Sequence, residues 1–380
     1  MNRRDLLKMA AQACGGLLAA MPWSRRSWAA DTARRGEKRP MASESELTWR
    51  DVREWGVEGK GWTDTEAYFD RLPARAKGVV REPVWNLSRQ SAGMSFQFET
   101  DATEISARWT LRSNTLAMGH MPATGVSGLD LYAQDEQGRF WWVAIGNPPT
   151  APKVQLKLAG GLKPGRRTYR VYLPLYNGVT SVEVSVPTKA AFQPVAPRKQ
   201  PAIVFYGTSI LQGGCASRPG MAHSAILGRR LNRPIINLGF SGNGIMEPEV
   251  AALLAELNPC VYVIDCLPNM EARLVAERAE PLVQTLRKAH PTTPVVLVED
   301  RTYTDATFLP ARRDRNLRSR EALRKAHERL LAAGVGNLHY VPGEHLLGDD
   351  GEAAVDGSHP TDLGFMRMAD ALEPVLRPLI

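Results

Sequence analysis

Cysteine is scarce in this sequence: the 380 residues contain four, and no two of them form a C-x-x-C pair. Cys14 lies in an N-terminal segment that we expect to be cleaved, which leaves Cys215, Cys260 and Cys266. An odd number of cysteines without a C-x-x-C pair argues against a disulfide framework and against a zinc site. On one strand, Cys260 and Cys266 would lie about 20 Å apart, too far to bond to each other. We expect the three to be small buried hydrophobic residues.

The motifs of nucleotide-binding proteins are also missing. No lysine follows Gly213 or Gly214, so the glycine-rich stretch after residue 207 is not a P-loop, and it does not contain G-x-G-x-x-G. Leu211 stands where the G-x-S-x-G elbow of the α/β-hydrolases needs its second glycine. No stripe of basic residues with interleaved aromatic side chains is present, which argues against nucleic acid as a partner.

Long apolar runs are absent as well. The apolar segment near the N-terminus, MAAQACGGLLAAMPW, has 15 residues, too few to span a bilayer. Arg3 and Arg4, followed by x-Leu-Leu-Lys, precede it, and the small residues Ser27 and Ala29 follow it, as signal peptidase requires. This arrangement resembles a Tat export signal. We therefore expect residues 1–29 to be a signal peptide of a bacterial protein that is periplasmic or secreted, with no integral membrane segment after cleavage.

Residues 30–46 have the composition of a disordered tether, with the polar stretch RRGEKRP at 34–40. Cleavage after residue 29 would remove five basic residues and one acidic residue, and would lower the formal net charge from +8 to +4. So modest and dispersed an excess of positive charge indicates no polyanionic partner. The sequence carries no signal for the oligomeric state.

Residues 47–190 show the two-residue period of β-strands. MSFQFET places Phe96 and Phe98 on one face, and EISARWTL does the same for Ile105, Ala107 and Trp109. Short strands separated by turns, with almost no helical period, predict an antiparallel β-sandwich. We expect a jelly-roll-like accessory domain.

Two turns of this half are predicted to close hairpins: Asn177-Gly178, which alternating runs flank, and DEQG at 135–138. The later stretch PTKAAFQPVAPRKQP, residues 187–201, crowds four prolines and three basic residues between periodic segments. We predict a linker over residues 191–200.

After residue 201, short β-branched runs alternate with helical segments. The runs are AIVFYG, PIINLG, CVYVIDC, PVVLVED and LHYVPG. Apolar strands joined by helical crossovers indicate a parallel sheet that is covered on both faces. We therefore predict a three-layer α/β/α domain over residues 201–380, flavodoxin-like, with a five-stranded parallel sheet. Ligands of such sheets bind at the carboxyl ends of the strands.

Residues with catalytic potential follow these strand ends. Ser209 follows the first strand, Gly242 lies in NLGFSGNG after the second, and Asn269 lies in DCLPNM after the third. Near the C-terminus, VDGSHPTDLGF places Asp356 three residues before His359. Each feature alone is better explained by a helix cap or an ordinary loop. All four in this order are much harder to obtain by chance.

The set resembles the motif blocks of the SGNH (GDSL-like) hydrolases over roughly residues 201–380. The blocks match Gly207-Thr208-Ser209, NLGFSG, the asparagine of DCLPNM and Asp356-x-x-His359. The resemblance implies that Ser209 is the nucleophile, His359 the general base and Asp356 the partner that orients the base.

The resemblance also implies an oxyanion hole made of the N–H groups of Ser209 and Gly242 and the side chain of Asn269. Two departures stand out: the family's Gly-Asp-Ser is Gly-Thr-Ser, and its Gly-x-Asn-Asp is Leu-Pro-Asn-Met. The catalytic positions survive, so only the loop-bracing bonds of the missing aspartates are in doubt. GLDLYA at 128–133 is similar to the signature of an N-terminal β-sandwich found in one subgroup.

These residue types suit ester hydrolysis. A serine hydroxyl becomes a nucleophile when a base removes its proton, and an imidazole titrates in the range that this needs. No cofactor is expected, and no metal, because the other histidines that we considered are scattered without ligand spacing: His223, His290, His327, His339 and His345.

Several residues remain as alternatives. Cys215 is a second candidate nucleophile, but it lies well past the strand end, and His223 is a second candidate base. Arg218 in ASRPG could clamp an anionic or hydroxylated substrate or could brace its loop. Three aromatic residues of the N-terminal half could stack on a sugar ring or pack in the core or the domain interface: Tyr132, Trp141 and Trp142.

The resemblance and the export signal together imply a serine esterase that acts on acyl esters, acetyl foremost, most readily those of a carbohydrate, whether small molecule or polysaccharide. Three alternatives stay open. The same acyl-enzyme could transfer its acyl group to a sugar acceptor. The protein could be a lipase or thioesterase, although no long apolar lid segment is present. It could also be a carbohydrate-binding protein without catalysis.

Overall fold

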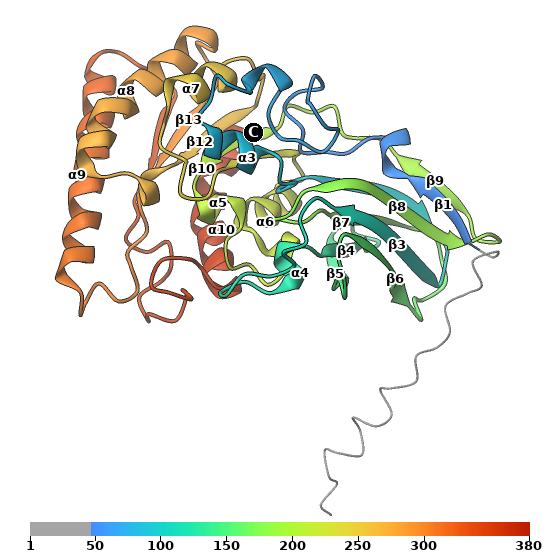
Figure 1. Ribbon diagram of the computed structural model, residues 1–380. Coiled ribbons are helices and arrows are strands. Elements are labelled where there is room, and N and C mark those ends of the chain that lie inside the picture. The colour runs from blue at the N-terminus through green and yellow to red at the C-terminus, as the bar shows by residue number, and fades with distance from the viewer. Residues whose placement is uncertain (1–46) are drawn as a thin grey trace, which may run out of the picture. The chain divides into compact units, whose positions relative to one another are not determined.

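The computed structural model describes residues 47–380. The expected export signal at 1–29 and the expected tether at 30–46 lie outside the described residues. Two antiparallel sheets occupy the N-terminal half of the described chain, and a parallel sheet with helices occupies the C-terminal half (Figure 1).

Nine antiparallel strands form a sandwich of two sheets around one apolar core. The first sheet has the order β1 (Leu47–Asp51), β8 (Val179–Pro187), β3 (Glu104–Leu111), β6 (Lys153–Gly160). The second has the order β5 (Phe140–Gly146), β4 (Leu129–Gln134), β7 (Arg167–Tyr172), β2 (Ser95–Thr100), β9 (Phe192–Val195). The predicted sandwich is confirmed, and the residues expected to share inner faces are buried: Phe96, Phe98, Ile105, Ala107 and Trp109.

One of the two predicted hairpins is wrong. β7 and β8, on either side of Asn177-Gly178, lie in different sheets, so this segment crosses the sandwich. The buried Asn177 amide donates to the carbonyl oxygens of Ser113, at 3.0 Å, and Thr115, at 3.4 Å. An alternating pattern tells which side chains face inward but not which sheet the strand joins. The DEQG turn does connect the antiparallel pair β4 and β5.

The predicted linker over residues 191–200 contains a strand. β9 pairs with β2 in antiparallel register. Phe192 stacks on Phe98 with ring centroids 5.2 Å apart, and a T-shaped contact at 5.9 Å joins Phe192 to Trp55. Pro194 suits this strand to the sheet edge, where a missing N–H is tolerated.

Much of the segment between β1 and β2 packs on the parallel sheet, although it falls inside the predicted sandwich domain, whereas Val52, Val57 and Phe69 of this segment join the sandwich core. The segment includes α3 (Glu82–Ser88), η3 (Val52–Glu54) and η4 (Ala74–Ala76). Other apolar side chains of the segment join the core beneath α7 and α8: Trp62, Leu72, Ala76, Val80, Val84 and Trp85. Arg71 of this segment is fully buried and donates to the carbonyl oxygens of Asn237 and Gly239 in β11, so the two halves share a polar anchor.

The parallel sheet has the order β11 (Ile235–Gly239), β10 (Ile203–Gly207), β12 (Val261–Asp265), β13 (Val295–Val298), β14 (Leu338–Val341). This 2-1-3-4-5 order is that of flavodoxin-like sheets, as predicted. All residues of β10 and β12 are buried, because helices cover both faces of the sheet.

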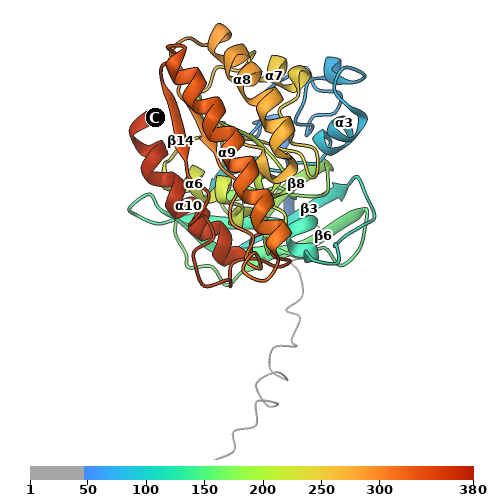
Figure 2. The same ribbon diagram turned by 90° about the vertical axis from the view of Figure 1, so that its left-hand side faces the viewer.

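Helices make the two outer layers of this half. One core contains residues of α7 (Pro248–Leu254), α8 (Ala272–Ala289) and α9 (Pro310–Ala332), and the other contains residues of α5 (Ser209–Gln212), α6 (His223–Arg230) and α10 (Asp362–Leu376). Figure 2 shows α8 and α9 side by side. The remaining short helices are α4 (Ala123–Val126), η5 (Pro219–Met221), η6 (Leu267–Asn269) and η7 (Arg377–Leu379). No helix between residues 47 and 380 has the length and apolarity to cross a bilayer.

Candidate active site

The candidate site lies where the strand order of the parallel sheet reverses. β10 pairs with β11 on one side and with β12 on the other, and Gly207 is level with both Gly239 and Asp265. The loops after these three strands therefore begin side by side. Ser209, Gly242 and Asn269 each belong to one of these loops, which fits the rule that ligands bind at such a switch point.

Ser209 is the first residue of the four-residue helix α5 and is 7% exposed. The Thr208 hydroxyl accepts a hydrogen bond from the Ile210 N–H at 3.3 Å, so threonine caps this helix where the family has aspartate. The carbonyl oxygen of Ser209 accepts a bond from the Tyr176 hydroxyl at 3.0 Å. A residue of the crossover between β7 and β8 thus helps to hold the Ser209 turn.

The side chains of Ser209, His359 and Asp356 form one chain of hydrogen bonds. Ser209 Oγ lies 2.8 Å from His359 Nε2, and His359 Nδ1 lies 2.8 Å from Asp356 Oδ2. Burial acts to raise the pKa of Asp356, but bonds from the His359 N–H, the His359 ring and the Ser358 N–H outweigh it and lower the pKa to about 2. Asp356 is therefore ionised at neutral pH, and an imidazole that donates from Nδ1 leaves the lone pair of Nε2 toward Ser209.

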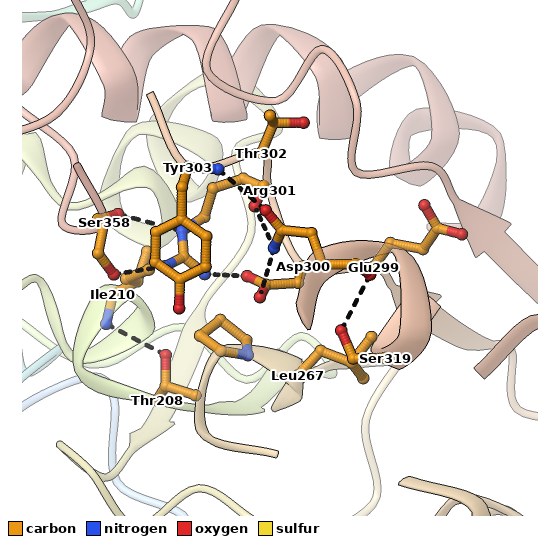
Figure 3. A network of polar contacts seen from close by, with 12 residues as sticks. Thr208, Ile210, Leu267, Glu299, Asp300, Arg301, Thr302, Tyr303, Ser319 and Ser358 are labelled. Carbon is orange, nitrogen blue, oxygen red and sulfur yellow. Dashed lines mark hydrogen bonds and ion pairs between the residues drawn. The ribbon is translucent and has the colours of Figure 1, made fainter. Parts of the chain in front are cut away.

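Arg301 fastens the loop that carries His359 to the body of the domain (Figure 3). Its fully buried guanidinium donates to the Ser358 carbonyl oxygen at 3.1 Å and to the Ser358 hydroxyl at 2.6 Å. Asp300 pairs with Arg301 and also with Arg315, at 2.8 Å, and accepts a bond from Asn316 at 2.9 Å. The region between β13 and α9 thereby positions the loop of His359.

Gly242 follows β11 in the left-handed backbone region, with φ of +69°. A Cβ at this position would have no atom within 4 Å, so glycine is required by the backbone conformation and not by crowding. The neighbouring Ser241 N–H donates to Gln212 Oε1 at 3.1 Å. Gln212 lies at the end of α5 and so couples this loop to the helix that begins at Ser209.

Asn269 ends the short helix η6 after β12. Its Oδ1 is buried and has no hydrogen-bond partner among the described residues. Arg315 of α9 donates to the carbonyl oxygens of Leu267, Pro268 and Met270, at 3.0 to 3.3 Å. These bonds brace the loop from outside. One of them reaches the backbone of Met270, the residue at the position of the family's missing aspartate.

The two alternative catalytic residues have unsuitable surroundings. Burial, with a smaller contribution from the charge of Asp356, raises the pKa of the Cys215 thiol to about 12, so it is not a thiolate at neutral pH. Both ring nitrogens of His223 are buried without a hydrogen-bond partner in the part of the chain that the structure describes, and the ring stacks on Phe365 with centroids 5.9 Å apart. Burial lowers the pKa of His223 to about 4, as expected for a core residue.

Arg218 contacts the β-sandwich. It pairs with the buried Asp130 at 3.0 Å and bonds the Tyr132 hydroxyl, and the Gly220 N–H donates to Asp130 at 2.8 Å. Of the two roles that the sequence leaves open for Arg218, these contacts favour bracing over substrate binding. They also give the GLDLYA stretch a physical role, since Asp130 and Tyr132 anchor the loop that follows Ser209.

The three aromatic candidates for sugar stacking differ in exposure. Tyr132 is only 3% exposed and is occupied by the contact with Arg218. Trp141 and Trp142 in β5 are 58% and 49% exposed. Of the three candidates, Trp141 and Trp142 therefore present ring surface to solvent, although Arg139 lies 5.3 Å from the ring centroid of Trp141 and Arg218 lies 5.2 Å from that of Trp142.

His120 is the residue near the site that the sequence analysis missed. It lies in the loop between β3 and α4, and its ring centroid is 5.7 Å from that of His359. Three potential ligand atoms, one from each of His120, Cys215 and His359, lie within 4.8 Å of one another. The expectation that histidines form no ligand cluster considered spacing along the chain, whereas folding brings together residues from distant loops.

A buried carboxyl lies beneath the site. Asp265 ends β12, and its Oδ2 has no hydrogen-bond partner among the described residues. Burial raises the pKa of Asp265 to about 7, against the attraction of Arg301, and Asp300 adds to the rise. The folded protein therefore retains this proton at pH values where the unfolded chain has lost it.

Asp265→Asn is expected to remove a pH dependence of stability. Below about pH 4 the carboxyl is protonated in both states, and between about pH 4 and 7 its burial increasingly destabilises the folded wild type. As the pH rises, the free energy of unfolding of the variant, measured with urea, should therefore increase relative to that of the wild type. The increase should total a few kcal/mol, on the order of 1.4 kcal/mol for each unit by which folding raises the pKa. The exposed Asp314→Asn is the control; a difference for Asp265→Asn that stays constant from pH 4 to 8 would contradict this prediction.

Comparisons with known proteins agree with this architecture. Residues 200–377 match the model of the GDSL-like lipase/acylhydrolase family, and residues 47–192 match a model for the N-terminus of SGNH-hydro-type esterases. No curated protein matches the chain.

Solved structures cover nearly all of the described residues. A protein from Bacteroides ovatus described as a GDSL-like lipase is 33% identical, with a TM-score of 0.83, over 88% of this chain and 98% of that chain. A salicylyl-acyltransferase from a tetracycline biosynthetic pathway (20% identity, TM-score 0.63, 90% and 96% covered) shares the fold. A family two carbohydrate esterase from Cellvibrio japonicus also shares the fold, with 13% identity and a TM-score of 0.57 over 88% of this chain and 98% of that chain. The chain thus belongs to the GDSL-like (SGNH) lipase/acylhydrolase family and is a carboxylic ester hydrolase.

Proposed function

We propose that this protein hydrolyses acyl esters, acetyl esters of carbohydrates foremost, through an acyl-enzyme on Ser209. The observation that carries the proposal is the hydrogen-bonded chain Ser209–His359–Asp356 at the carboxyl end of β10. The residue types, their order and their place in the sheet are those that a serine nucleophile with a general base requires.

Acylation would begin with attack of Ser209 Oγ on the ester carbonyl carbon. His359 Nε2 accepts the hydroxyl proton as the new C–O bond forms, and the ionised Asp356 stabilises the imidazolium. The tetrahedral oxyanion would be bound by the N–H groups of Ser209 and Gly242 and by the Asn269 amide, from three neighbouring loops. His359 then returns the proton to the alcohol, which leaves.

Deacylation repeats these steps with water as the nucleophile. His359 takes a proton from the water, the carboxylic acid leaves Ser209, and the serine hydroxyl is restored. A sugar hydroxyl in place of the water would give acyl transfer instead. The shared fold of the salicylyl-acyltransferase keeps transfer as an outcome to be tested.

The exposed Trp141 and Trp142 support a carbohydrate as the alcohol part of the ester. Flat aromatic faces suit sugar rings, and Trp141 and Trp142 are 58% and 49% exposed. As successive residues of β5 they face opposite sides of the sheet, so each would offer its ring to a sugar separately. The fold shared with carbohydrate esterases agrees with this assignment.

The proposal is tested by p-nitrophenyl acetate hydrolysis, followed by product analysis on acetylated xylan, pectin and peptidoglycan. We expect acetate release from at least one polysaccharide and labelling of Ser209 by a fluorophosphonate. An inactive wild type that the probe does not label would overturn the enzyme assignment of this site. Acetate loss that requires a sugar acceptor would replace hydrolysis with transfer.

Asn269→Ala is expected to lower kcat by about 100- to 1000-fold and to change KM little, because the lost donor contacts the oxyanion and not the ground-state ester. Steady-state kinetics on p-nitrophenyl acetate measure both constants. Asn258→Ala, at an exposed site near the start of β12, is the matched control. An unchanged kcat for Asn269→Ala would remove this residue from the oxyanion hole.

We also propose that residues 1–29 direct Tat-type export, that residues 30–46 are a tether, and that the mature esterase is periplasmic or secreted. The twin arginines, the short apolar segment and the small residues before position 30 support this assignment. Replacement of Arg3 and Arg4 by lysine should leave the protein in the cytoplasm.

A further inference from the structure

Three potential metal ligands converge beside Ser209, and ester hydrolysis uses only one of them. They are His120 from the loop before α4, Cys215 from the loop after α5, and His359 from the loop before α10. One ligand atom of each lies within 4.8 Å of the other two. Cys215 is buried, His359 is partly buried and His120 is exposed. Within residues 47–380, this is the one group of histidine, cysteine or acidic side chains that meets this distance criterion.

We propose that His120, Cys215 and His359 form an inhibitory site for a zinc-class transition metal ion. One thiolate and two imidazoles are ligands that Zn²⁺ prefers, whereas Mg²⁺ and Ca²⁺ prefer oxygen. Zn–N bonds of about 2.0 Å and Zn–S bonds of about 2.3 Å place tetrahedral ligand atoms about 3.3–3.6 Å apart. The exposed His120 side chain can move by the ångström or so that closes the site.

His359 is already oriented for a metal. Its Nδ1 donates to Asp356 at 2.8 Å, so the Nε2 lone pair is the one that a metal would bind. In zinc sites, a histidine that binds the metal usually donates its other ring N–H to a carboxylate in this way. Ser209 Oγ, 2.8 Å from the same nitrogen, or a water molecule could supply the fourth ligand.

The backbone at Cys215 gives a second, independent indication. Its φ of +73° lies in the left-handed region, which residues other than glycine and asparagine seldom adopt. A cysteine at this position costs on the order of 1 kcal/mol relative to glycine. The chain has cysteine at this position despite the cost, although the same loop has glycine at 213, 214 and 220. The result is a thiol next to His359.

Metal binding would inhibit ester hydrolysis because the metal and the Ser209 proton need the same Nε2 lone pair of His359. The Cys215 thiol loses its proton to water as the metal–sulfur bond forms, and no oxidation takes place. With Nε2 bound to the metal, His359 cannot accept the Ser209 proton. Inhibition thus rests on the proposed role of His359, whereas metal binding itself does not.

Two measurements on the full-length protein, stripped with EDTA and desalted, test the site. In the first, Zn²⁺ is titrated against p-nitrophenyl acetate hydrolysis. We expect inhibition that saturates near one equivalent, that EDTA reverses and that Mg²⁺ does not reproduce. In the second, Co²⁺ replaces Zn²⁺, and the thiolate-to-cobalt charge-transfer band and the intensity of the d–d bands report tetrahedral ligation by sulfur.

Variants separate the ligands from the chemistry. His120→Ala and Cys215→Ser, each compared with its own metal-free rate, should weaken zinc inhibition more than about 100-fold. Loss of a group that only hydrogen-bonds to a metal ligand already lowers metal affinity by about 10- to 100-fold. Cys215→Ser should also abolish the charge-transfer band. The controls His345→Ala and Cys260→Ser lie outside the cluster and should respond to zinc as the wild type does.

Ser209→Ala distinguishes the two proposals. This variant should bind Co²⁺ with the thiolate band intact, so metal binding can be tested even if the proposed hydrolysis fails. Absence of the band in the wild type would overturn the metal site and leave the esterase proposal untouched. Equal zinc inhibition in the wild type, His120→Ala and Cys215→Ser would also overturn it, because the metal would then bind elsewhere.

Discussion

Replacement of Ser209 by alanine should lower kcat for p-nitrophenyl acetate by about 10⁵- to 10⁶-fold, the loss expected when a serine hydrolase loses its nucleophile. No acyl-enzyme can form without Oγ, and His359 Nε2 then has no hydroxyl to deprotonate. A residual rate above that of water would remain from the oxyanion donors and from substrate binding. Initial rates and fluorophosphonate labelling measure the effect.

The fold should survive this change. Oγ makes its hydrogen bond to His359, while the Ser209 carbonyl bond to Tyr176 involves only the backbone and is retained. The melting temperature is therefore expected to stay within a few degrees of the wild type. Ser113→Ala, at an exposed serine in the sandwich, should keep full activity. A Ser209→Ala protein that is folded and still active would show that another group is the nucleophile.

Much of the parallel half could be predicted because its signals are local. β10 and β12 are short apolar runs, fully buried, and each ends at a glycine or an aspartate followed by a loop. That Ser209, Gly242 and Asn269 follow neighbouring strand ends could be predicted because a parallel sheet brings the carboxyl ends of its strands to one edge. Their mutual placement required only the strand order.

The N-terminal half was harder because its decisive contacts are not local. The run around Asn177 has the alternation and the turn of a hairpin, yet its two strands join different sheets. The segment from 62 to 85 has no strand period. Its two tryptophans are core residues because they pack in the same cluster as residues of α7 and α8, which come much later in the chain. No pattern in the sequence could pair Arg71 with the carbonyl oxygens of β11.

Residues that support the site were missed for the same reason. Gln212 holds the loop of Gly242, Arg315 holds the loop of Asn269 and Arg301 holds the loop of His359. Each does so through bonds to backbone or hydroxyl groups that carry no sequence signature. His120 lies in the other half of the chain, more than two hundred residues from His359. A family motif marks the proposed reacting groups, whereas the side chains that brace their loops are visible only in three dimensions.

Asp356→Asn is expected to lower kcat by about 10⁴-fold, the size of loss that the same change causes in a serine protease triad. Asp356 Oδ1 accepts the Ser358 N–H at 3.0 Å and the His359 N–H at 2.8 Å. In the variant the amide oxygen should keep these two bonds, so the NH₂ group replaces Oδ2 and points at His359 Nδ1. A donor there forces Nδ1 to accept, moves the ring proton to Nε2 and leaves no lone pair for Ser209.

This argument predicts an unusual order of activities. Asp356→Ala should be at least as active as Asp356→Asn, because Asp356 is partly exposed and water can accept the Nδ1 proton once the side chain is gone. Asp350→Asn, which alters a surface carboxylate paired with Arg367, should be close to wild type. Steady-state rates rank the variants, and ring-nitrogen NMR shifts identify the tautomer of His359. An Asn variant clearly more active than the Ala variant would show that Asp356 acts by charge or packing and does not select the tautomer.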